Sequence, residues 1–574
     1  MEKRVFLAIF LCFLVLAIYQ SYFAPPPPAP VVTQNTAAPA AATPPAPGAV
    51  PAASAPASTG ATSVAPAPAT PVSTAKVLIG DTVARDIVVQ TDAVTATFST
   101  QGAVLKSYRL RGYHDAKGEP LELIPVDLIG VDKPFTVATD NDQESATLAT
   151  ALYQPSADQL SLGSQPGTLS FEYRDDSGLS ARKTFYFQPD KQPFQLNVEA
   201  SADVRAAPRP ITIKFGPGIG PGFSADGTTP RALQSFNGDI LRLTPADVQT
   251  QARYEGTLRF TGVDDHYFLA VALPNPPTAR AEFVPITVPI PGDPKGATRS
   301  FIAFSIRPDP GAAPAGTVKL RFFIGPKDFD HLRTADSQLT YAIDVGMFRI
   351  IVIPLLQALR WIHSFVGNWG WSIVVLTILI NILIFPFRHR SMVSMKKMQA
   401  IQPQVKAIQD RYAKYKITDP ERQKMNTEMM ALYKSKGVSP AGGCLPMLMT
   451  MPILLAFYQL LSHAIELRGA PFVGWIHDLS TKDPTYVWPI MMGATMFWQQ
   501  RMMPTTADPT QQKIFMLMPV IFTVMFLSVP SGLVVYWLVS NLLTIGQQYL
   551  TNHIISTKGG PPPAPRVANA LTKA

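Results

Sequence analysis

The stretch that decides the fold class reads Ser372-Ile-Val-Val-Leu-Thr-Ile-Leu-Ile-Asn-Ile-Leu-Ile-Phe-Pro-Phe387 and contains no charged residue. With Trp369-Gly-Trp371 before it, the run reaches the roughly 20 residues that a helix needs to cross a bilayer. Over all 574 residues, 47% are hydrophobic and only 16% are charged, against about 25% charged in ordinary soluble domains. The sequence therefore predicts a multi-span α-helical membrane protein.

Other apolar runs lie on both sides of this stretch. The N-terminal run follows the basic start Met1-Glu-Lys-Arg4, and Tyr22 stands where a cleavage site needs a small residue, so we expect an uncleaved signal anchor. Several of the later runs are shorter than a typical bilayer requires, which favours local thinning of the membrane. We expect six transmembrane helices, over residues 1–23, 369–387, 443–463, 486–503, 514–529 and 532–552.

The distribution of charge predicts which loops are cytoplasmic. Residues 388–440 hold 12 lysines or arginines and four acidic residues, whereas 464–485 hold only Arg468 and Lys482 as bases. By the positive-inside rule, 388–440 is a cytoplasmic loop, as are 504–513 and the basic tail 553–574. Both termini are then cytoplasmic, and residues 24–335 and 464–485 lie on the opposite side of the membrane.

The segment between the first two spans has two parts. Residues 24–76 are rich in Pro and Ala, with 14 prolines and no charged residue over 24–75, which predicts an extended linker. Residues 77–335 show the period-two pattern of short strands, as in Val94–Phe98 and Leu169–Tyr173, so we expect a large all-β sandwich. Its polar clusters, which we expect to be solvated loops, are His114-Asp115, Asp264-Asp-His266 and Asp328–His331.

Two further segments predict helices outside the bilayer core. Residues 341–368 mix large apolar side chains with Arg349 and Arg360, which favours an amphipathic helix at the outer interface over a seventh span. In 388–440, apolar residues recur in steps of three and four, and Thr418-Asp-Pro-Glu421 restarts a helix. We therefore expect a basic cytoplasmic helical hairpin.

Motifs for catalysis are missing from the sequence. It contains no Walker phosphate loop, no G-x-S-x-G elbow and no HExxH pair, and Ser394-Met-Lys-Lys397 lacks the companions of an acyl-transfer site. His463-Ala-Ile-Glu466 has no second ligand pair, and the two cysteines, Cys12 and Cys444, lie in separate apolar runs. We expect no enzyme activity, no cofactor and no metal.

Polar residues inside the spans are the better indication of function. Thr377 and Asn381 lie four residues apart and share one helix face. Such groups are costly in lipid unless they face protein or water, so they form either interhelical hydrogen bonds or the lining of a water-filled cavity. The residues alone leave both possibilities open.

Several longer motifs resemble the YidC/Oxa/Alb family of bacterial membrane protein insertases, in its Gram-negative form with a large periplasmic domain. The matching residues are Trp361–Gly370, Met429–Lys434, Pro440–Pro446, Trp475–Ser480, Pro504–Thr506, Pro530–Tyr536 and Ser540-Asn541. The resemblance implies a five-helix insertase core in the inner membrane with a groove open to the cytoplasm and to lipid. The implied partners are nascent membrane proteins, the Sec translocon, the ribosome through the basic loop and tail, and the lipid bilayer, with no specific DNA.

The resemblance also implies site residues. Asn381 stands where the family commonly has arginine, which leaves open what supplies the groove charge; Arg388, His389 and Arg390, about two turns further on, are candidates at the groove mouth. The implied groove residues are Thr377, Asn381, Gln499, Tyr536, Trp537 and Ser540. The implied residues of the cytoplasmic entrance are Arg388, Arg390, Met395, Lys396, Lys397 and Met398. Two alternatives remain, a solute or ion transporter and a periplasmic carbohydrate-binding protein with a membrane anchor.

Overall fold

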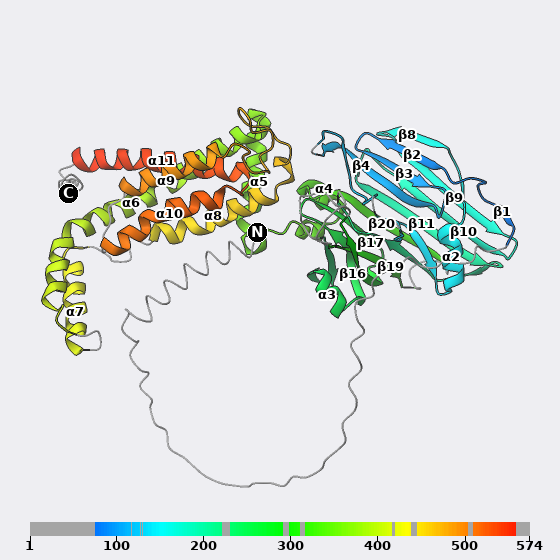
Figure 1. The fold of residues 1–574 in the computed structure, drawn as a ribbon, viewed down its shortest axis with the longest axis horizontal. Helices are drawn as coiled ribbons and strands as arrows, with labels where there is room; N and C mark the ends of the chain where they lie inside the picture. The colour runs from blue at the N-terminus through cyan, green and yellow to red at the C-terminus, as the bar shows by residue number, and fades with distance from the viewer. Residues whose placement is uncertain are drawn as a thin grey trace, which may run out of the picture.

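A computed structural model describes residues 75–557 except 116, 127, 129, 221–229, 291–297, 310–315, 416–418, 438–444 and 503–508. The predicted anchor (1–23), nearly all of the linker (24–76) and most of the tail (553–574) lie outside the described residues. Figure 1 shows two regions along the long axis, a β domain (residues 77–335) and a helical region (residues 349–557).

The β domain contains two sheets. The larger runs in the order β1-β9-β10-β11-β20-β17-β16-β18-β19-β13-β6, with four short strands off this path, and the smaller in the order β5-β4-β3-β2-β8. The strands are β1 Val77–Ile79, β2 Asp86–Thr91, β3 Val94–Ser99, β4 Val104–His114, β5 Pro120–Glu122, β6 Thr136–Thr139, β7 Gln154–Pro155, β8 Gln159–Gly163, β9 Gly167–Asp175, β10 Leu179–Phe187, β11 Gln195–Val204, β12 Ala207–Pro208, β13 Ile211–Phe215, β14 Arg231–Phe236, β15 Asp239–Leu243, β16 Arg253–Asp264, β17 Phe268–Pro274, β18 Thr278–Pro289, β19 Thr298–Pro308 and β20 Thr317–Pro326.

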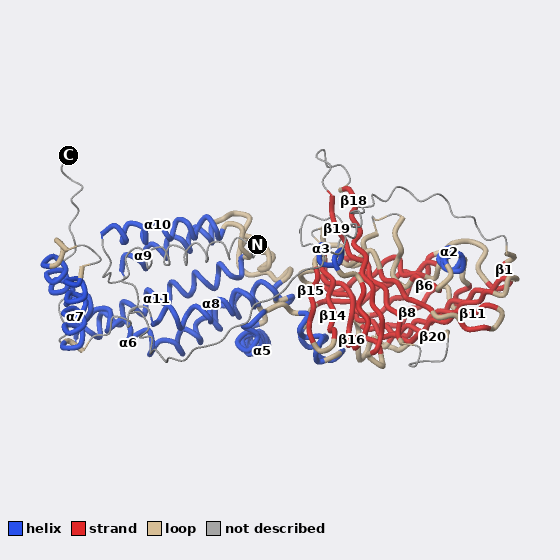
Figure 2. The backbone as a smooth tube through the Cα atoms, turned by 90° about the horizontal axis from the view of Figure 1, so that it is seen from below, coloured by secondary structure: helices blue, strands red, loops and turns tan. Residues whose placement is uncertain are grey.

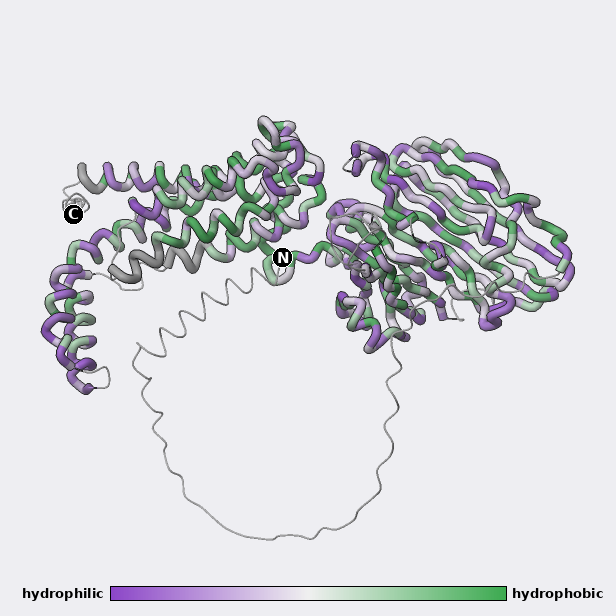
Figure 3. The backbone as a smooth tube through the Cα atoms, in the orientation of Figure 1, coloured by the Kyte–Doolittle hydropathy of each residue, from purple (hydrophilic) through white to green (hydrophobic). Residues whose placement is uncertain are grey.

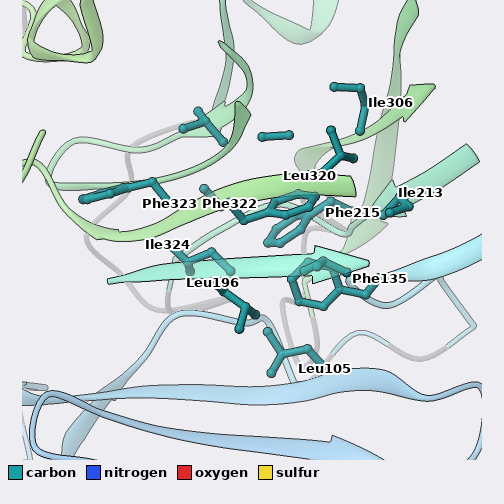
Figure 4. Close-up of a cluster of buried hydrophobic side chains, with 14 of the residues drawn as sticks. Leu105, Phe135, Leu196, Ile213, Phe215, Ile306, Leu320, Phe322, Phe323 and Ile324 are labelled. Atoms are coloured by element: carbon teal, nitrogen blue, oxygen red, sulfur yellow. The ribbon is translucent and has the colours of Figure 1, made fainter. Parts of the chain in front are cut away.

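Alternation of buried and exposed side chains builds the core between these layers. Along β3 every second residue is buried, as a strand with one face on a core requires. Phe98 of β3 lies with its ring centroid 4.6 Å from that of Phe185 on β10, which joins the two sheets. Phe215 of β13 stacks on Phe322 of β20, two strands that are not neighbours, so the large sheet curves over its own core. Figure 4 shows the part of this core around Phe215 and Phe322.

One buried cation ties the two layers together. Lys183 of β10 is 1% exposed, and its ammonium donates hydrogen bonds to the carbonyl oxygens of Gly102 (2.6 Å), Ala103 (3.3 Å) and Phe135 (2.8 Å). Ala103 and Phe135 have φ angles of 46° and 70°, in the left-handed region that residues with a side chain rarely adopt. Lys183 therefore fixes two strained turns from inside the core.

The helices are bounded as follows, with short 3-10 segments between them. They are α2 Asp142–Thr150, α3 Pro245–Thr250, α4 Phe329–Ala335, η2 Ser337–Ala342, η3 Gly346–Phe348, α5 Arg349–Val366, α6 Trp369–Arg411, α7 Pro420–Ser435, α8 Leu445–His463, η5 Ile465–Leu467, α9 Val487–Met502, α10 Pro509–Phe526 and α11 Ser531–Thr557. The side chain of Asn368 caps α6, and that of Asp419 caps α7.

One helix, α6, covers both the predicted second span and the first arm of the hairpin. At 1.5 Å per residue its 43 residues extend about 65 Å, roughly twice the thickness of a hydrocarbon core. Its last turns pack against α7, where Ile401 and Val405 contact Met429 and Leu432. Figure 1 places α7 at the end of the helical region away from the β domain, and Figure 3 shows this hairpin as largely hydrophilic.

The α5 helix has a different orientation from the other long helices. Figures 1 and 2 show it running across the direction of α8, α9, α10 and α11. It buries Val352, Leu356 and Leu359 against the helical core and exposes Ile350 and Trp361. By length and composition, 346–366 and 369–411 are the two segments among the described residues that could cross a membrane, and 451–463 and 516–526 are shorter apolar helices.

Candidate functional site

A polar cluster joins α6 and α11 near the middle of the helical region. Thr377 and Asn381 are 0% and 4% exposed, and the Asn381 side-chain nitrogen donates to the Thr377 carbonyl oxygen at 2.8 Å. One guanidinium nitrogen of Arg388 donates to Asn381 Oδ1 (2.8 Å) and to Thr544 Oγ1 (2.8 Å). The Gln547 amide donates to the Asn381 carbonyl oxygen at 3.2 Å. The Asn381 side chain therefore accepts a hydrogen bond from an arginine whose backbone lies two turns further along the same helix.

Both partners of the Arg388 nitrogen are neutral oxygens. Its charge has no carboxylate partner among the residues that the structure describes. A guanidinium that is half-buried beside apolar helices, with two neutral partners, attracts anionic groups more strongly than an arginine that is paired or fully solvated.

The polar face of α11 continues from this cluster toward the hairpin. Thr551 is 1% exposed, and its hydroxyl lies 3.1 Å from His389 Nδ1. Gln548 is also 1% exposed, yet neither polar atom of its side chain has a hydrogen-bond partner within the described part of the chain. The same holds for Oδ1 of Asn552. Buried amides without protein partners are stable only where water or another polar ligand reaches them.

The opposite end of the helical region, which faces the β domain, is closed by the loop between α8 and α9. The Ser531 hydroxyl donates to the Thr481 carbonyl oxygen at 2.8 Å, and the Gly532 N–H donates to the Leu479 carbonyl oxygen at 2.9 Å. The ring of Phe472 lies so close to Gly370 of α6 that a Cβ there would be 2.0 Å from a ring carbon. The polar cluster thus has a packed end toward the β domain.

The structure brings together only some of the predicted groove residues. Thr377 and Asn381 form one cluster together with Arg388, which was predicted for the entrance. The Tyr536 ring instead stacks on Phe457 of α8, with centroids 4.3 Å apart. Trp537, next in sequence, faces α10, where its ring lies 4.9 Å from that of Phe526. The Ser540 carbonyl oxygen accepts from Thr544, and Gln499 is half-buried on α9.

The predicted entrance residues spread along α6. Arg390 and Lys397 are exposed, whereas Met395 and Lys396 are half-buried. Met398 packs against Ile401 and Val405 inside the hairpin. Met398 therefore contributes to ordinary hairpin packing in this arrangement.

The prediction for two polar clusters of the β domain is wrong. Asp264-Asp-His266 and Asp328–His331 were expected to be solvated loops, but Asp264 is fully buried and His266 and Asp328 contact the helical region. Short polar runs between strands look alike in sequence whether water or another region of the chain covers them. Asp115 does lie in an exposed turn, where its carboxylate accepts from the backbone of Lys117 and Glu119.

The polar residues at the end of α11 are not among the predicted groove residues. Thr544, Gln548 and Asn552 recur every four residues and therefore share one face of the helix. All three lie within the predicted span 532–552, and their four-residue spacing is visible in the sequence.

Comparison with protein families identifies both regions. Residues 86–358 match the model of the YidC periplasmic domain, and 361–558 match that of the 60Kd inner membrane protein. The YidC membrane protein insertase of Geobacter sulfurreducens is 36% identical over 81% of this chain and 86% of its own length. That of Syntrophus aciditrophicus is 33% identical over 96% and 99%. A crystal structure of an active YidC insertase covers 83% of this chain and 95% of its own, at 17% identity and a TM-score of 0.34.

These matches decide among the functions left open by the sequence. They favour the insertase over the transporter and over the anchored carbohydrate-binding protein, and they make the β domain a periplasmic domain and the helical region part of an inner membrane protein. The chain belongs to the YidC family of membrane protein insertases.

Proposed function

We propose that the chain inserts nascent membrane proteins through a hydrated groove between α6 and α11, open to the cytoplasm and to lipid. The observation that carries the proposal is the half-buried Arg388 bound to Asn381 and Thr544, with the unpartnered Gln548 amide on the same side of α11. A polar substrate segment would enter this groove while an adjacent apolar segment leaves sideways into lipid. The chain would do this alone or together with the Sec translocon.

The proposed topology has six spans with both termini in the cytoplasm. Five of the spans, over 369–387, 443–463, 486–503, 514–529 and 532–552, form the core, with α5 at the outer interface and the sandwich in the periplasm. The placement of the basic hairpin at the end opposite the β domain supports this orientation. The basic loop and tail would contact the ribosome and anionic lipid.

Arg388 supplies the groove charge that Asn381 lacks. The guanidinium reaches back two turns to the Asn381 side chain, so the positive charge sits close to residue 381 although it belongs to residue 388. A charge in this partly dehydrated place attracts an acidic substrate segment, whereas Arg390, exposed on the same helix, is screened by water.

The test is insertion of a single-span substrate with an acidic translocated segment into proteoliposomes containing only this protein. Arg388→Gln should lower the insertion rate about tenfold, equivalent to about 1.4 kcal/mol. Arg390→Gln is the matched control and should change the rate less than about twofold. The double variant Arg388→Gln/Asn381→Arg should recover insertion, because it returns a charge to the same place.

Equal losses from Arg388→Gln and Arg390→Gln would contradict the role of Arg388. A substrate without acidic residues serves as a second control, because its insertion should depend on Arg388 much less.

A further inference from the structure

The β domain is attached to the helical region by more than the chain connection. Arg360 of α5 donates from Nη2 to Asp328 Oδ2 (2.6 Å), from Nη1 to Asp330 Oδ2 (2.6 Å) and from Nε to Glu466 Oε1 (2.7 Å). Asp328 and Asp330 lie at the start of α4 in the β domain, and Glu466 lies in η5, just after α8. One side chain therefore joins three separate segments, and Figure 1 shows α4 on the side of the β domain toward α5.

A second contact lies beside the first. His266 Nε2 is 2.7 Å from the carbonyl oxygen of Ser462, and its ring centroid is 5.0 Å from that of His463, at the end of α8. The Arg468 guanidinium lies 5.0 Å from the ring centroid of Phe268. We call these contacts, together with those of Arg360, the junction.

The β-domain side of the junction is held rigidly. The buried ammonium of Lys327 binds Asp264 Oδ2 at 2.6 Å and the Asp265 carbonyl oxygen at 2.7 Å, which fixes the turn that carries His266. Asp328 uses its other oxygen, Oδ1, to cap α4 through the N–H groups of Asp330 and His331. A movement of either residue would therefore break hydrogen bonds inside the β domain.

Burial makes the Arg360 contacts stronger than ordinary surface pairs. The side chains of Arg360, Asp328 and Glu466 are 20%, 18% and 11% exposed, whereas that of Asp330 is 73% exposed. Removing one member of such a cluster leaves half-buried charges without partners, which costs more than losing an exposed pair. Asp328 and Glu466 therefore carry most of the contact.

The junction acts on helices that enclose the proposed groove. Val352 and Leu356 of α5 line a small pocket together with Leu460 and His463 of α8, so α5 and the end of α8 meet directly under the junction. Three residues before Leu460, Phe457 stacks on Tyr536 of α11, the helix that bears the polar face. A displacement at the end of α8 is thus transmitted to α11 through packed side chains.

We propose that Arg360 is a positioning residue, which holds α5 and the outer end of α8 against the periplasmic domain so that the helices around the groove keep one arrangement. The proposal rests on the insertase function proposed above. It assigns to the periplasmic domain a mechanical role at its contact with the membrane region.

The experiment replaces the ionic contact by a covalent one. His266→Cys and His463→Cys are introduced into the full chain with Cys12 and Cys444 changed to serine, and disulfide formation between the two new thiols is followed under mild oxidation. The pair is then combined with Arg360→Gln, with Arg360→Lys, or with Arg333→Gln, which removes an exposed arginine from α4. Insertion is measured for each protein, oxidised and reduced.

We expect Arg360→Gln to slow disulfide formation and to lower insertion in the reduced state, each about fivefold, because the junction opens more often. Oxidation should restore insertion to within about twofold of the parent, because the disulfide now holds the two regions together. The disulfide and insertion rates of Arg360→Lys should lie between those of the parent and Arg360→Gln, since one ammonium cannot replace the forked guanidinium. Arg333→Gln should show the same rates as the parent.

Two results would overturn the proposal. Disulfide formation as fast in Arg360→Gln as in the parent would show that Arg360 does not hold the junction, and insertion that stays low after complete oxidation would show that it acts elsewhere. If Arg360→Gln does not accumulate, Glu466→Gln tests the same contact with the guanidinium kept. A chain that keeps His266 and His463, with only Cys12 and Cys444 replaced, is the reference for the proposed function: if it inserts nothing, the proposed function is contradicted, while the disulfide rates still decide the junction.

Discussion

The buried lysines of the β domain and the polar groups around Arg388 in the helical region differ in their partners. In the β domain, Lys183 and Lys327 are buried with short hydrogen bonds to carbonyl or carboxylate oxygens. In the helical region, Arg388 has only neutral partners, and the buried amide of Gln548 has none within the described part of the chain. The first arrangement stabilises one structure. The second leaves a positive charge and hydrogen-bonding groups available to water or a substrate segment.

Hydrogen bonding and position, taken together, separate structural from functional polar residues in this chain. Burial alone does not discriminate, because Lys183, Asn381 and Gln548 are all at least 96% buried. Hydrogen bonding separates Lys183 from Gln548 but does not by itself mark a functional group, because Gln234 of β14 is fully buried with both amide atoms unpartnered as well. Gln548 differs in its position, on the helix face that also carries Thr544, the partner of Arg388.

The largest effect on stability is expected from Lys183→Met in the β domain. The change leaves the carbonyl oxygens of Gly102, Ala103 and Phe135 buried without a donor and should lower the free energy of unfolding by about 3 kcal/mol. Hydrogen exchange of the β3 and β4 amides in the full detergent-solubilised chain measures this. Exchange rates equal to those of the parent would show that Lys183 does not stabilise the turns.

The opposite sign is expected from Gln548→Leu. Replacing a buried, unpartnered amide by an apolar side chain should leave the melting temperature unchanged or raise it slightly, but should lower the insertion rate about fivefold by drying the groove. Thermal unfolding and reconstituted insertion are measured on the same preparation. A loss of stability that accompanies the loss of insertion would mean that Gln548 is structural, like Lys183.

A gradual effect is expected from pH on the β domain. Burial lowers the pKa of Lys183 to about 7 from its ordinary value of 10.5. Between these values the unfolded chain binds the proton that the folded chain has lost, so the free energy of unfolding rises with pH from about 7 to 10.5, by at most about 1.4 kcal/mol per unit. The difference between the parent and Lys183→Met profiles isolates this group. A flat difference would show that the three carbonyl oxygens keep Lys183 charged throughout.

The smallest effect is expected where polar groups are neither buried nor unpartnered. The exposed pair between Arg411 of α6 and Glu428 of α7 spans 2.8 Å, with side chains 62% and 38% exposed. Arg411→Gln should change the free energy of unfolding by no more than about 0.5 kcal/mol and leave insertion unchanged. A large loss of insertion would instead assign Arg411 to a partner surface.

Much of the fold could be predicted because its causes are local. The apolar run around Thr377 and the caps at Asn368 and Asp419 act within a few residues, and each is visible in the sequence. The pairing of Thr377 with Asn381 followed from helical spacing. The contacts of Arg360 with Asp328 and of His266 with Ser462 could not be predicted, because they depend on how the two regions dock.

The proposed groove requires that the face of α11 between Thr544 and Asn552 is hydrated from the cytoplasm. In a chain without Cys12 and Cys444, Gln548→Cys is compared with Leu538→Cys, a residue 3% exposed in the apolar part of the same helix. A membrane-impermeant maleimide is added to either side of oriented vesicles. For a hydrated groove, we predict that position 548 is labelled from the cytoplasmic side at least about tenfold faster than position 538. From the other side, we predict no labelling at position 548. Equal, slow labelling at both positions would contradict it and make the buried amides part of a dry helix interface.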